Sequence, residues 1–584
     1  MSFATPMVGY SHEGELNKES KVKYNWNVIT ETDFKERVRR VFKAVSSALT
    51  NTLGPYGSTT IIEQYGEMHV TKDGWQVLKN IHFKDTTDNN ILMLLLRISA
   101  QVVLKVGDGS TSSIVAANAI LEEMEKRHEE IKYIRSKDFM TILNHCVKLI
   151  SDEIYSSSNK VNKETYDEIY KLAYVATNGD DNIADMIQTI YKKTNNPTIE
   201  YVKSKDDKTY YEIVDGYKLE NLTYIDSIFV TNNEDGTCEI KNPLFLLFDH
   251  KVTLEQSSKL INAALDKAYD THRRLVVVAP YFDKYFLESV QKSINVEFKA
   301  RGTSTIVYAR VSLVNNLSHH LYNDFAVMCG AEIIKEQLVE EFEGLDADQL
   351  KEAIHNTYIG ETELTIIGAK DTVVKGFIKR NENMYNKVMD DAILKYNNME
   401  KDYRDKGIVD TKLTEHKNRV TKLRGSMGII HVGGYSTLEK KANYDLIEDA
   451  IKACESATLY GFNCGGNLVI PHIIKGILSN NDISVNERLI YEILSDAFKN
   501  VFKTVLKNKY SDENTVVLSK DDMLNDIIDN CIYNEKLIAY NLITEEYSTD
   551  VINSCITDIE ILRATASIIS LLISSNQYIS ILQN

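Results

Sequence analysis

The feature that most constrains this chain is a pair of glycine-rich turns near its N-terminal end, each of which follows a helical pattern. A helical pattern ends in a glycine-rich turn, two short strand patterns lead into an acidic turn, and a second helical pattern ends in another glycine-rich turn. Glycine allows the backbone to approach a ligand closely, and the amides at a helix N-terminus favour negative charge. The pattern therefore indicates an anion-binding site, although each turn alone is also typical of ordinary helix ends.

The first turn ends a long amphipathic helix that we expect over Glu31 to Leu53. Its apolar residues recur at spacings of three and four, which places them on one face. The chain then reads T-L-G-P-Y-G from Thr52 to Gly57, which offers a hydroxyl and several amides to a phosphate. A helix C-terminal cap would use the same residues, so both interpretations stay open.

The acidic turn follows two strands that we expect at Thr60 to Ile62 and Met68 to Thr71. Its aspartate, Asp73, precedes a glycine, and Asp-Gly is a strong turn signal. Asp73 is therefore either a turn former or an acid near the terminal phosphate of a nucleotide, with Lys72 as its charge partner.

The second helix is expected from Asn89 to Lys105, and the octet V-G-D-G-S-T-S-S follows from Val106 to Ser113. Asp108, between two glycines, is suited to hold Mg²⁺ beside an anion. A G-D-G turn followed by Ser or Thr also starts ordinary helices. The octet therefore indicates a binding site only together with its neighbouring motifs.

Composition narrows the classes of function. A chain of 584 residues, 43% of them hydrophobic, is long enough for about three or four domains. The net charge of −17 argues against a general nucleic-acid binder, which needs basic surface. The seven cysteines include no C-x-x-C pair and predict reduced, mostly buried thiols in a cytoplasmic protein.

No membrane partner is expected. The stretch from Met1 to Asn25 is polar and lacks the pattern of a secretory signal. The richest apolar runs, Ile91 to Leu96 and Ala566 to Ile573, are shorter than the roughly 20 apolar residues that span a bilayer.

The order of T-L-G-P-x-G, T-K-D-G and G-D-G-[ST]-[ST]-[ST] resembles that of the chaperonins, specifically the GroEL-type group I family. A Walker-type phosphate loop is missing, so ordinary P-loop chemistry is not indicated. The resemblance implies a multidomain α and α/β fold, with a mostly helical equatorial domain, a small α/β intermediate domain and an α/β apical domain. The implied boundaries are 1–26 for a polar N-terminal extension, 27–157 and 461–584 for the equatorial ATP-binding domain, 158–214 and 428–460 for the intermediate hinge domain, and 215–427 for the apical substrate-binding domain.

The resemblance also implies ATP and Mg²⁺ as cofactors, with K⁺ as a further candidate and Asp108 as the metal ligand. For the ribose contact, direct counting leads to Thr557 and a shift of one place leads to Asp558, which we prefer. The implied nucleotide-binding residues are Thr52, Leu53, Gly54, Pro55, Lys72, Asp108, Gly109, Ser110, Thr111, Ser112, Gly466, Asn541, Leu542, Ile543 and Asp558.

Asp449 stands in L-I-E-D-A-I, which resembles the family's helix whose aspartate positions the hydrolytic water. Attack on a γ-phosphorus needs an oriented water and a carboxylate that accepts its proton. Without the resemblance Asp449 reads as a solvated helix acid, since Asp445 and Glu448 stand beside it. With the resemblance, Asp449 and Asp73 are the expected catalytic residues.

Between these segments the pattern becomes mixed α/β. Buried strands are expected at Leu244 to Phe248, Leu275 to Ala279, Thr305 to Ala309 and Leu364 to Ile367, with amphipathic helices between several of them. The pair His319-His320 has no further ligands at a metal-like spacing, so we expect it in a surface loop from Val311 to His320.

The resemblance implies that exposed apolar side chains of the apical domain bind client protein. Gln291 and Lys292 fall where apolar residues would be expected, and the alternative is that the apolar candidates pack in the core. The candidates are Tyr224, Ile228, Phe229, Leu260, Ile261, Leu287 and Val290.

The implied function is an ATP-dependent chaperone that encapsulates non-native proteins in a homo-oligomeric ring. The expected ring has seven subunits, singly or as a pair of rings, and a co-chaperonin lid is a further candidate partner. The C-terminal segment from Ile581 to Asn584 is suited to strand pairing with a neighbouring subunit. A composition rich in Tyr, Asn, Ile and Lys suggests an AT-rich genome, such as that of a phage or an intracellular bacterium, and a phage protein would act in the host cytoplasm.

Two other functions stay open from the sequence. One is a ring-forming scaffold or adaptor with little hydrolysis, which the polar residues on the apical helix favour. The other is an unrelated metabolic kinase or ATPase, which no small-molecule substrate motif supports.

Overall fold

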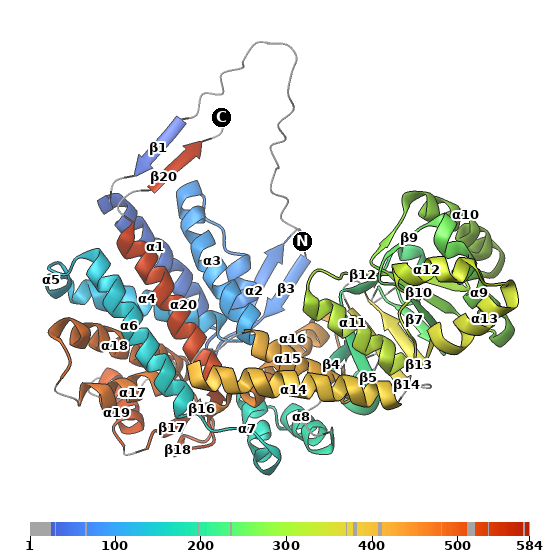
Figure 1. Cartoon of the computed structure of the whole chain (residues 1–584). Coiled ribbons are helices and arrows are strands. Elements are labelled where there is room, and N and C mark those ends of the chain that lie inside the picture. Colours follow the sequence, from blue (N-terminus) through green and yellow to red (C-terminus); the bar gives the residue numbers. More distant parts are fainter. Residues whose placement is uncertain are drawn as a thin grey trace.

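The computed structural model describes most of the chain, and the polar stretch 1–24 of the expected N-terminal extension lies outside the described residues. These are 25–29, 31–64, 67–194, 198–204, 206–233, 236–368, 371–377, 382–406, 411–479, 482–510, 520–534, 536–575 and 578–582. Figure 1 shows the blue and red ends of the sequence together in a helical unit, and the green and yellow middle of the sequence in a separate α/β unit.

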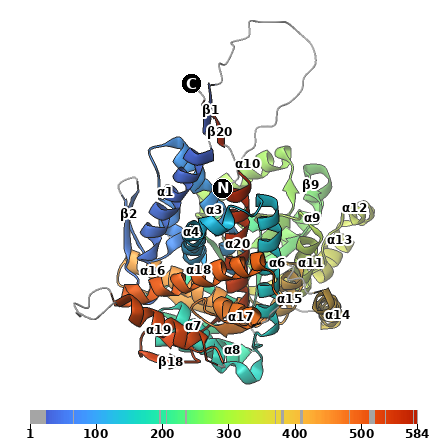
Figure 2. The same cartoon turned by 90° about the vertical axis from the view of Figure 1, so that its left-hand side faces the viewer.

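The helical unit is built on one large core to which both ends of the chain contribute. The apolar face of α1 is buried there, and α20 packs against α3, α4 and α6 (Figure 2). The predicted helices before the two glycine turns are confirmed. The helices of this unit are α1 (Glu31–Thr50), α2 (Gly74–Lys79), α3 (Thr86–Val106), α4 (Ser110–Lys126), α5 (His128–Ile131), α6 (Ser136–Ser156), α17 (Val469–Leu478), α18 (Val485–Lys509), α19 (Lys520–Ile532) and α20 (Cys555–Ser574).

Short antiparallel strand pairs extend from these helices. The C-terminal strand forms as expected, and its partner here is the N-terminal strand of the same chain, with Trp26 opposite Ile581. The pairs are β1 (Asn25–Ile29) with β20 (Tyr578–Leu582), β2 (Thr60–Gln64) with β3 (Glu67–Thr71), β16 (Phe462–Cys464) with β19 (Ile552–Ser554), and β17 (Ala539–Asn541) with β18 (Glu546–Ser548).

A smaller unit lies between the helical and α/β units and has its own hydrophobic cluster. Its strand β15 pairs in parallel with β4 and antiparallel with the first half of β5. The elements are the 3-10 turn Lys163–Thr165, α7 (Asp167–Ala176), α8 (Asp181–Thr194), β4 (Thr198–Lys203), β15 (Ser426–Val432) and α16 (Thr437–Tyr460).

The α/β unit continues the same sheet, in the order β4-β15-β5-β14-β13-β8-β10-β12-β6, with β7 paired to β13. Its parallel strands β8, β10 and β12 confirm three of the four predicted buried strands. The fourth, Leu364 to Ile367, lies in the antiparallel strand β13, where only Thr365 and Ile367 of that stretch are buried. The strands of this sheet are β5 (Tyr210–Glu220), β6 (Leu222–Tyr224), β7 (Cys238–Lys241), β8 (Leu244–Leu247), β10 (Leu275–Ala279), β12 (Ile306–Val311), β13 (Ile359–Ile367) and β14 (Asp371–Phe377). The short strands β9 (Lys251–Val252) and β11 (Tyr281–Phe282) form a separate parallel pair.

Helices cover this sheet, and two of them, α14 and α15, form a long hairpin that returns the chain to β15 (Figure 1). The helices are α9 (Leu254–Thr271), α10 (Lys284–Arg301), α11 (Asn316–Cys329), α12 (Glu336–Glu343), α13 (Ala347–Ala353), α14 (Glu382–Lys406) and α15 (Thr411–Leu423), with a 3-10 turn at Ser227–Phe229 and a π turn at Ile354–Tyr358. The loop expected from Val311 to His320 is shorter than predicted, because His319 and His320 lie in the first turn and a half of α11.

The joint between the smaller unit and the α/β unit is centred on strand β5, which pairs with strands of both units. Its first half pairs with β15 and its second half with β14. At the change of partner, the Gly216 amide donates to the Gly425 carbonyl at 2.7 Å, and Gly425 has a φ of 71°. A Cβ on Gly216 would lie 2.8 Å from the Val374 carbonyl oxygen of the neighbouring strand, so the joint requires glycine.

All seven cysteines are free thiols and six of them are buried, as the sequence predicts. Among the helices of the described residues, none combines the length and apolar character needed to cross a bilayer.

Candidate nucleotide-binding site

The first glycine turn is fixed by α18, from the C-terminal part of the chain. Gly54 has a φ of 76°, which side chains rarely adopt, and a Cβ there would lie 2.6 Å from Val505 Cγ1. Asn508 Nδ2 donates to the carbonyls of Thr50 at 2.8 Å and Leu53 at 2.9 Å. The turn is therefore held in one conformation by residues far away in the sequence.

Two of the predicted nucleotide-binding residues, Thr52 and Lys72, form hydrogen bonds with residues at or next to the first glycine turn. The Thr52 hydroxyl donates to the Leu49 carbonyl at 2.8 Å and so caps the end of α1. The Lys72 ammonium donates to the Pro55 carbonyl at 3.0 Å, which ties the acidic turn to the glycine turn. Burial lowers the pKa of Lys72.

Asp73 has the first of its two expected roles, that of a turn former, and its role near a nucleotide stays a prediction. Its Oδ1 accepts from the Trp75 amide at 2.8 Å, so Asp73 is the N-cap of α2. The adjacent Gly74 lies so close to α4 that a Cβ there would be 1.8 Å from Thr111 Oγ1. The acidic turn therefore abuts the serine and threonine residues of the octet.

The octet places one carboxylate at an uncapped helix N-terminus. Gly107 and Gly109, on either side of Asp108, have φ values of 83° and 86°. No side chain caps α4 at Gly109, and the Gly109 amide donates to Asp108 Oδ1 at 2.5 Å. Ser110 is buried, and the Thr111 and Ser112 side chains that follow are half-buried. The first amides of α4 therefore face the site, where they favour an anion.

Three carboxylates from distant segments converge on this N-terminus. Asp449, on α16, is half-buried, and its burial together with repulsion by Asp108 and Asp73 raises its pKa to about 9. Asp108 retains access to solvent, but the protein that surrounds it raises the pKa of its carboxyl group. Lys452, on the next turn of α16, lowers both pKa values. The predicted acids are thus neighbours and repel one another.

A fourth carboxylate, Asp558, lies beneath the octet at the start of α20. It is fully buried, Asn467 Nδ2 donates to its Oδ1 at 2.7 Å, and within the described residues its Oδ2 has no hydrogen-bond donor. Burial raises the pKa of Asp558 to about 7. Thr557 is also buried, with its methyl group toward Gly109. The preference for Asp558 as the ribose contact stays a prediction.

The predicted glycine Gly466 follows β16 in a left-handed conformation, with a φ of 80°. A Cβ there would lie 2.9 Å from the Phe502 ring of α18, so the turn is packed tightly. Gly466 adjoins Asn467, the hydrogen-bond partner of Asp558.

The segment predicted to contact the base lines a pocket of about 570 Å³. Asn541, Leu542 and Ile543 form one wall together with Pro55 of the first glycine turn. The Asn541 side chain accepts from the Ile543 amide at 2.9 Å and thereby shapes its own turn. The opposite wall comes from the smaller unit, through Tyr170, Tyr174, Val175, Asn178 and Gly179.

Sequence reasoning missed the residues of that opposite wall and also missed Lys452. The wall is contributed by α7 and the turn after it, a region that the sequence marked only as a hinge. Gly179 has a φ of 98°, and a Cβ there would lie 2.8 Å from Ile543 Cδ1. For Lys452 the available signal was its spacing of three residues from Asp449 on one helix.

The predicted client-binding residues lie in the α/β unit, and the expectation of exposed side chains is wrong for three of them. Phe229, Leu260 and Ile261 are buried in its core, with at most 4% of each residue exposed. The side chains that share their face of α9 pack against the sheet. The remaining candidates are half-buried against the same core: Tyr224, Ile228, Leu287 and Val290.

The residues of the site fit a nucleotide with a divalent cation. A cation would relieve the repulsion among Asp73, Asp108 and Asp449, and Asp558 Oδ2 offers an acceptor to a hydroxyl. Within the part of the chain that the structure describes, no three His, Cys, Asp or Glu side chains are arranged as a complete metal-binding group. Mg²⁺ commonly takes one or two carboxylates and fills its shell with phosphate oxygens and water.

Fold and site together define a class: a multidomain protein whose helical unit carries three acids at an uncapped helix N-terminus and whose chain continues through a smaller unit into an α/β unit. The chain matches the model of the TCP-1/cpn60 chaperonin family over residues 45–580. It therefore belongs to the TCP-1/cpn60 chaperonin family, and the predictions of family and fold class are confirmed.

Relatives and a solved structure agree with this family. The chain is 26% identical over 494 residues to a chaperonin GroEL of Orientia tsutsugamushi (strain Boryong), with 84% of each chain covered. It is 26% identical over 544 residues to a chaperonin GroEL of Anaplasma phagocytophilum, with 92% of each covered. The crystal structure of the chaperonin gp146 from bacteriophage EL 2 (Pseudomonas aeruginosa), in the presence of ATP-BeFx, has a TM-score of 0.65, 19% identity, and coverage of 94% of this chain and 98% of that one.

Proposed function

We propose that this protein is an ATP-dependent chaperonin that binds non-native proteins in a homo-oligomeric ring and promotes their folding through hydrolysis-driven domain movement. The observation that carries the proposal is the convergence of Asp73, Asp108 and Asp449 on the uncapped N-terminus of α4. Membership of the chaperonin family supports it.

In the proposed mechanism, different segments of the site would bind different parts of the nucleotide. The amides at the start of α4 and in the turn from Thr52 to Gly57 would bind phosphate oxygens. Asp108 would hold Mg²⁺, which when bound neutralises charge on those oxygens. The pocket beside Asn541 would take the base, and Asp558 would accept a hydrogen bond from the ribose.

Asp449 would orient the attacking water and accept its proton, and Asp73 would support it from the acidic turn. Asp449 belongs to α16, in the smaller unit, whereas Asp73 and Asp108 belong to the helical unit. The catalytic group therefore assembles only when the smaller unit lies against the helical unit, which couples hydrolysis to a movement about a hinge.

We assign the domains as the sequence predicts: equatorial at 27–157 and 461–584, intermediate at 158–214 and 428–460, and apical at 215–427. The glycine joint at Gly216 and Gly425 supports a hinge at the border between intermediate and apical domains. We further propose K⁺ as an additional cation, a ring of seven subunits in one or two layers, and action in the cytoplasm, which is that of the host cell if a phage encodes the protein.

Client binding would use the half-buried candidates Tyr224, Ile228, Leu287 and Val290 once the apical domain moves, and would not use the three core residues. A co-chaperonin lid would dock on the same domain.

The experiment that tests the proposal combines two measurements on the purified protein, with Asp449→Asn as the inactive reference. The expected result is steady-state ATP hydrolysis together with protection of a denatured test protein from aggregation. A protein that forms rings but shows neither activity would contradict the proposal and would favour a scaffold.

A further inference from the structure

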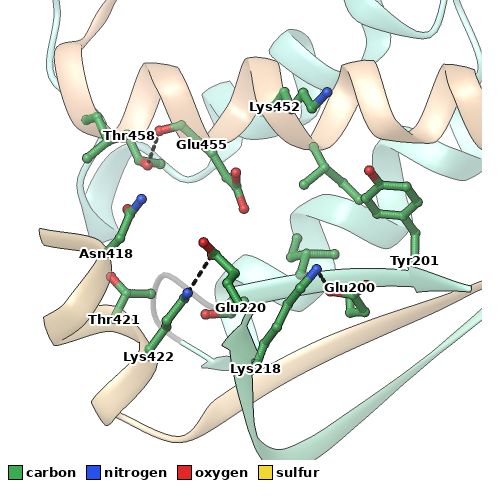
Figure 3. Close-up of a pocket in the computed structure, with 14 residues that line it drawn as sticks. Glu200, Tyr201, Lys218, Glu220, Asn418, Thr421, Lys422, Lys452, Glu455 and Thr458 are labelled. Carbon is green, nitrogen blue, oxygen red and sulfur yellow. Dashed lines mark hydrogen bonds and ion pairs between the residues drawn. The ribbon is translucent and has the colours of Figure 1, made fainter. Parts of the chain in front are cut away.

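Helix α16 directs charged side chains toward two different places (Figure 3). Glu455 points into a cavity of about 220 Å³ between β4, β5, α15 and α16, at the joint to the α/β unit. Lys452 also lines this cavity, but its ammonium lies on the other side of the helix in Figure 3. The same helix therefore connects the acids at the start of α4 with the cavity at the joint.

The aliphatic part of Lys452 lies against the octet at a point where only glycine leaves room for it. A Cβ on Gly107 would lie 2.2 Å from Lys452 Cδ and 2.7 Å from Lys452 Cβ. Because Gly107 immediately precedes Asp108, this packing holds the lysine beside the candidate metal ligand. It is also a contact between the smaller unit and the N-terminus of α4.

The Lys452 ammonium is held near negative charge from two sides. It forms an ion pair of 2.5 Å with Glu448 Oε1, one turn earlier on α16. It also acts favourably on the carboxylates of Asp108 and Asp449. In the proposed site the terminal phosphate would lie between these two acids, because Asp108 would hold the metal and Asp449 would orient the attacking water.

An ammonium in this position has the chemistry of a phosphate contact. Lysine binds phosphate as a mobile point charge, and it can exchange a partly exposed carboxylate partner for a phosphate oxygen. The side chain of Glu448 is about one-third exposed, so its ion pair with Lys452 is weak.

We propose that Lys452 is a specificity-determining residue that recognises the terminal phosphate of ATP and thereby docks α16 on the nucleotide. The inference rests on the proposed ATPase function. In this scheme a nucleoside diphosphate leaves Lys452 paired with Glu448, whereas a triphosphate draws it away. Binding of the third phosphate by Lys452 would then shift the position of α16. The same helix carries Glu455, which lines the hinge cavity.

The hinge cavity is suited to respond to such a shift. Its two lysines are already paired, Lys218 with Glu200 at 2.6 Å and Lys422 with Glu220 at 2.7 Å, as the dashed lines in Figure 3 show. Within the described residues Glu455 has no ion pair within 4 Å, but the charges of Lys218 and Lys422 act on it across the cavity and partly offset the rise in its pKa that burial causes. A movement of α16 would therefore change the charge balance of the hinge.

The test is equilibrium binding of a non-hydrolysable ATP analogue and of ADP, each with Mg²⁺, to the full-length protein. For Lys452→Met we expect about 10- to 100-fold weaker binding of the analogue and a change of less than about twofold for ADP, since a charge-assisted contact to one phosphate is lost. Lys452→Arg should restore most of the difference. Lys148→Met, an exposed lysine of α6, is the matched control and should change neither affinity.

Glu448→Gln gives a prediction of opposite sign, because it removes the competing partner of the lysine. It should tighten binding of the analogue relative to ADP, and the gain should vanish in the double variant with Lys452→Met. An equal loss for both nucleotides, or unchanged analogue binding in a folded Lys452→Met protein, would overturn the inference. If the parental protein binds neither nucleotide, the proposed function itself fails. If the parental protein and Lys452→Met prefer the analogue over ADP to the same degree, only the role of Lys452 fails.

Discussion

Replacement of Asp558 by asparagine should make the nucleotide-free protein more stable above neutral pH and less able to bind ATP. The Asp558 carboxyl group is fully buried, with one oxygen bonded to Asn467 and the other lacking a donor within the described residues. Asparagine keeps the shape of the side chain and has no charge to bury.

The magnitude follows from the pKa, which burial raises from its ordinary value of 3.8 to about 7. The folded protein therefore holds a proton that the unfolded chain loses between these values, so stability falls as pH rises from about 4 to 7. At 1.36 kcal/mol per pKa unit, the ionised group costs about 4 kcal/mol at pH 8. Asp558→Asn should recover up to that amount at pH 8 and close to none at pH 4.

The assay is calorimetric unfolding of both proteins at the two pH values, with Asp526→Asn, an exposed aspartate of α19, as the control for loss of charge alone. Binding of ATP should weaken in Asp558→Asn, and Thr557→Val should leave it unchanged if Asp558 is the ribose contact. A variant that is less stable at pH 8, or equally shifted at both pH values, would refute the reasoning.

Three further predictions concern the chemistry and the core. Asp449→Asn should bind ATP normally and hydrolyse it at least about 100-fold more slowly, because general-base catalysis is lost; hydrolysis at the parental rate would contradict the assignment. Arg419→Met should destabilise the α/β unit by about 3–5 kcal/mol in calorimetry, since it leaves the fully buried Asp324 unpaired, and an unchanged unfolding temperature would show that the pair is dispensable. Leu260→Ala should cost about 2–5 kcal/mol as a core truncation, with exposed Lys259→Ala as its control; lost client capture without lost stability would contradict the burial.

The sequence predicted the parts of the fold that local patterns determine. The helix ending at the first glycine turn, the hairpin before Asp73 and the buried strands such as β10 follow from periodicity and turn chemistry. The resemblance to chaperonins then indicated that Asp73, Asp108 and Asp449 belong to one site, which no local pattern could indicate.

The direction in which a helix face points could not be read from the resemblance, and this explains the error in the α/β unit. Leu260 and Ile261 share a spacing of three and four with Ser257, Ala264 and Ala268, and all five are buried on one face of α9. That periodicity was present in the sequence and indicated a core face. The wall that Tyr174 and Gly179 contribute to the pocket beside Asn541 depends on how the smaller unit packs, which local sequence does not determine.

The most direct test of the central claim is the yield of refolded client after dilution of a denatured test protein into the purified protein with Mg-ATP. The account predicts that yield rises with ATP, rises little with a non-hydrolysable analogue, and falls to the analogue level in Asp449→Asn. Equal yields with ATP, with the analogue and in Asp449→Asn would contradict the claim that this chain is an ATP-driven chaperonin.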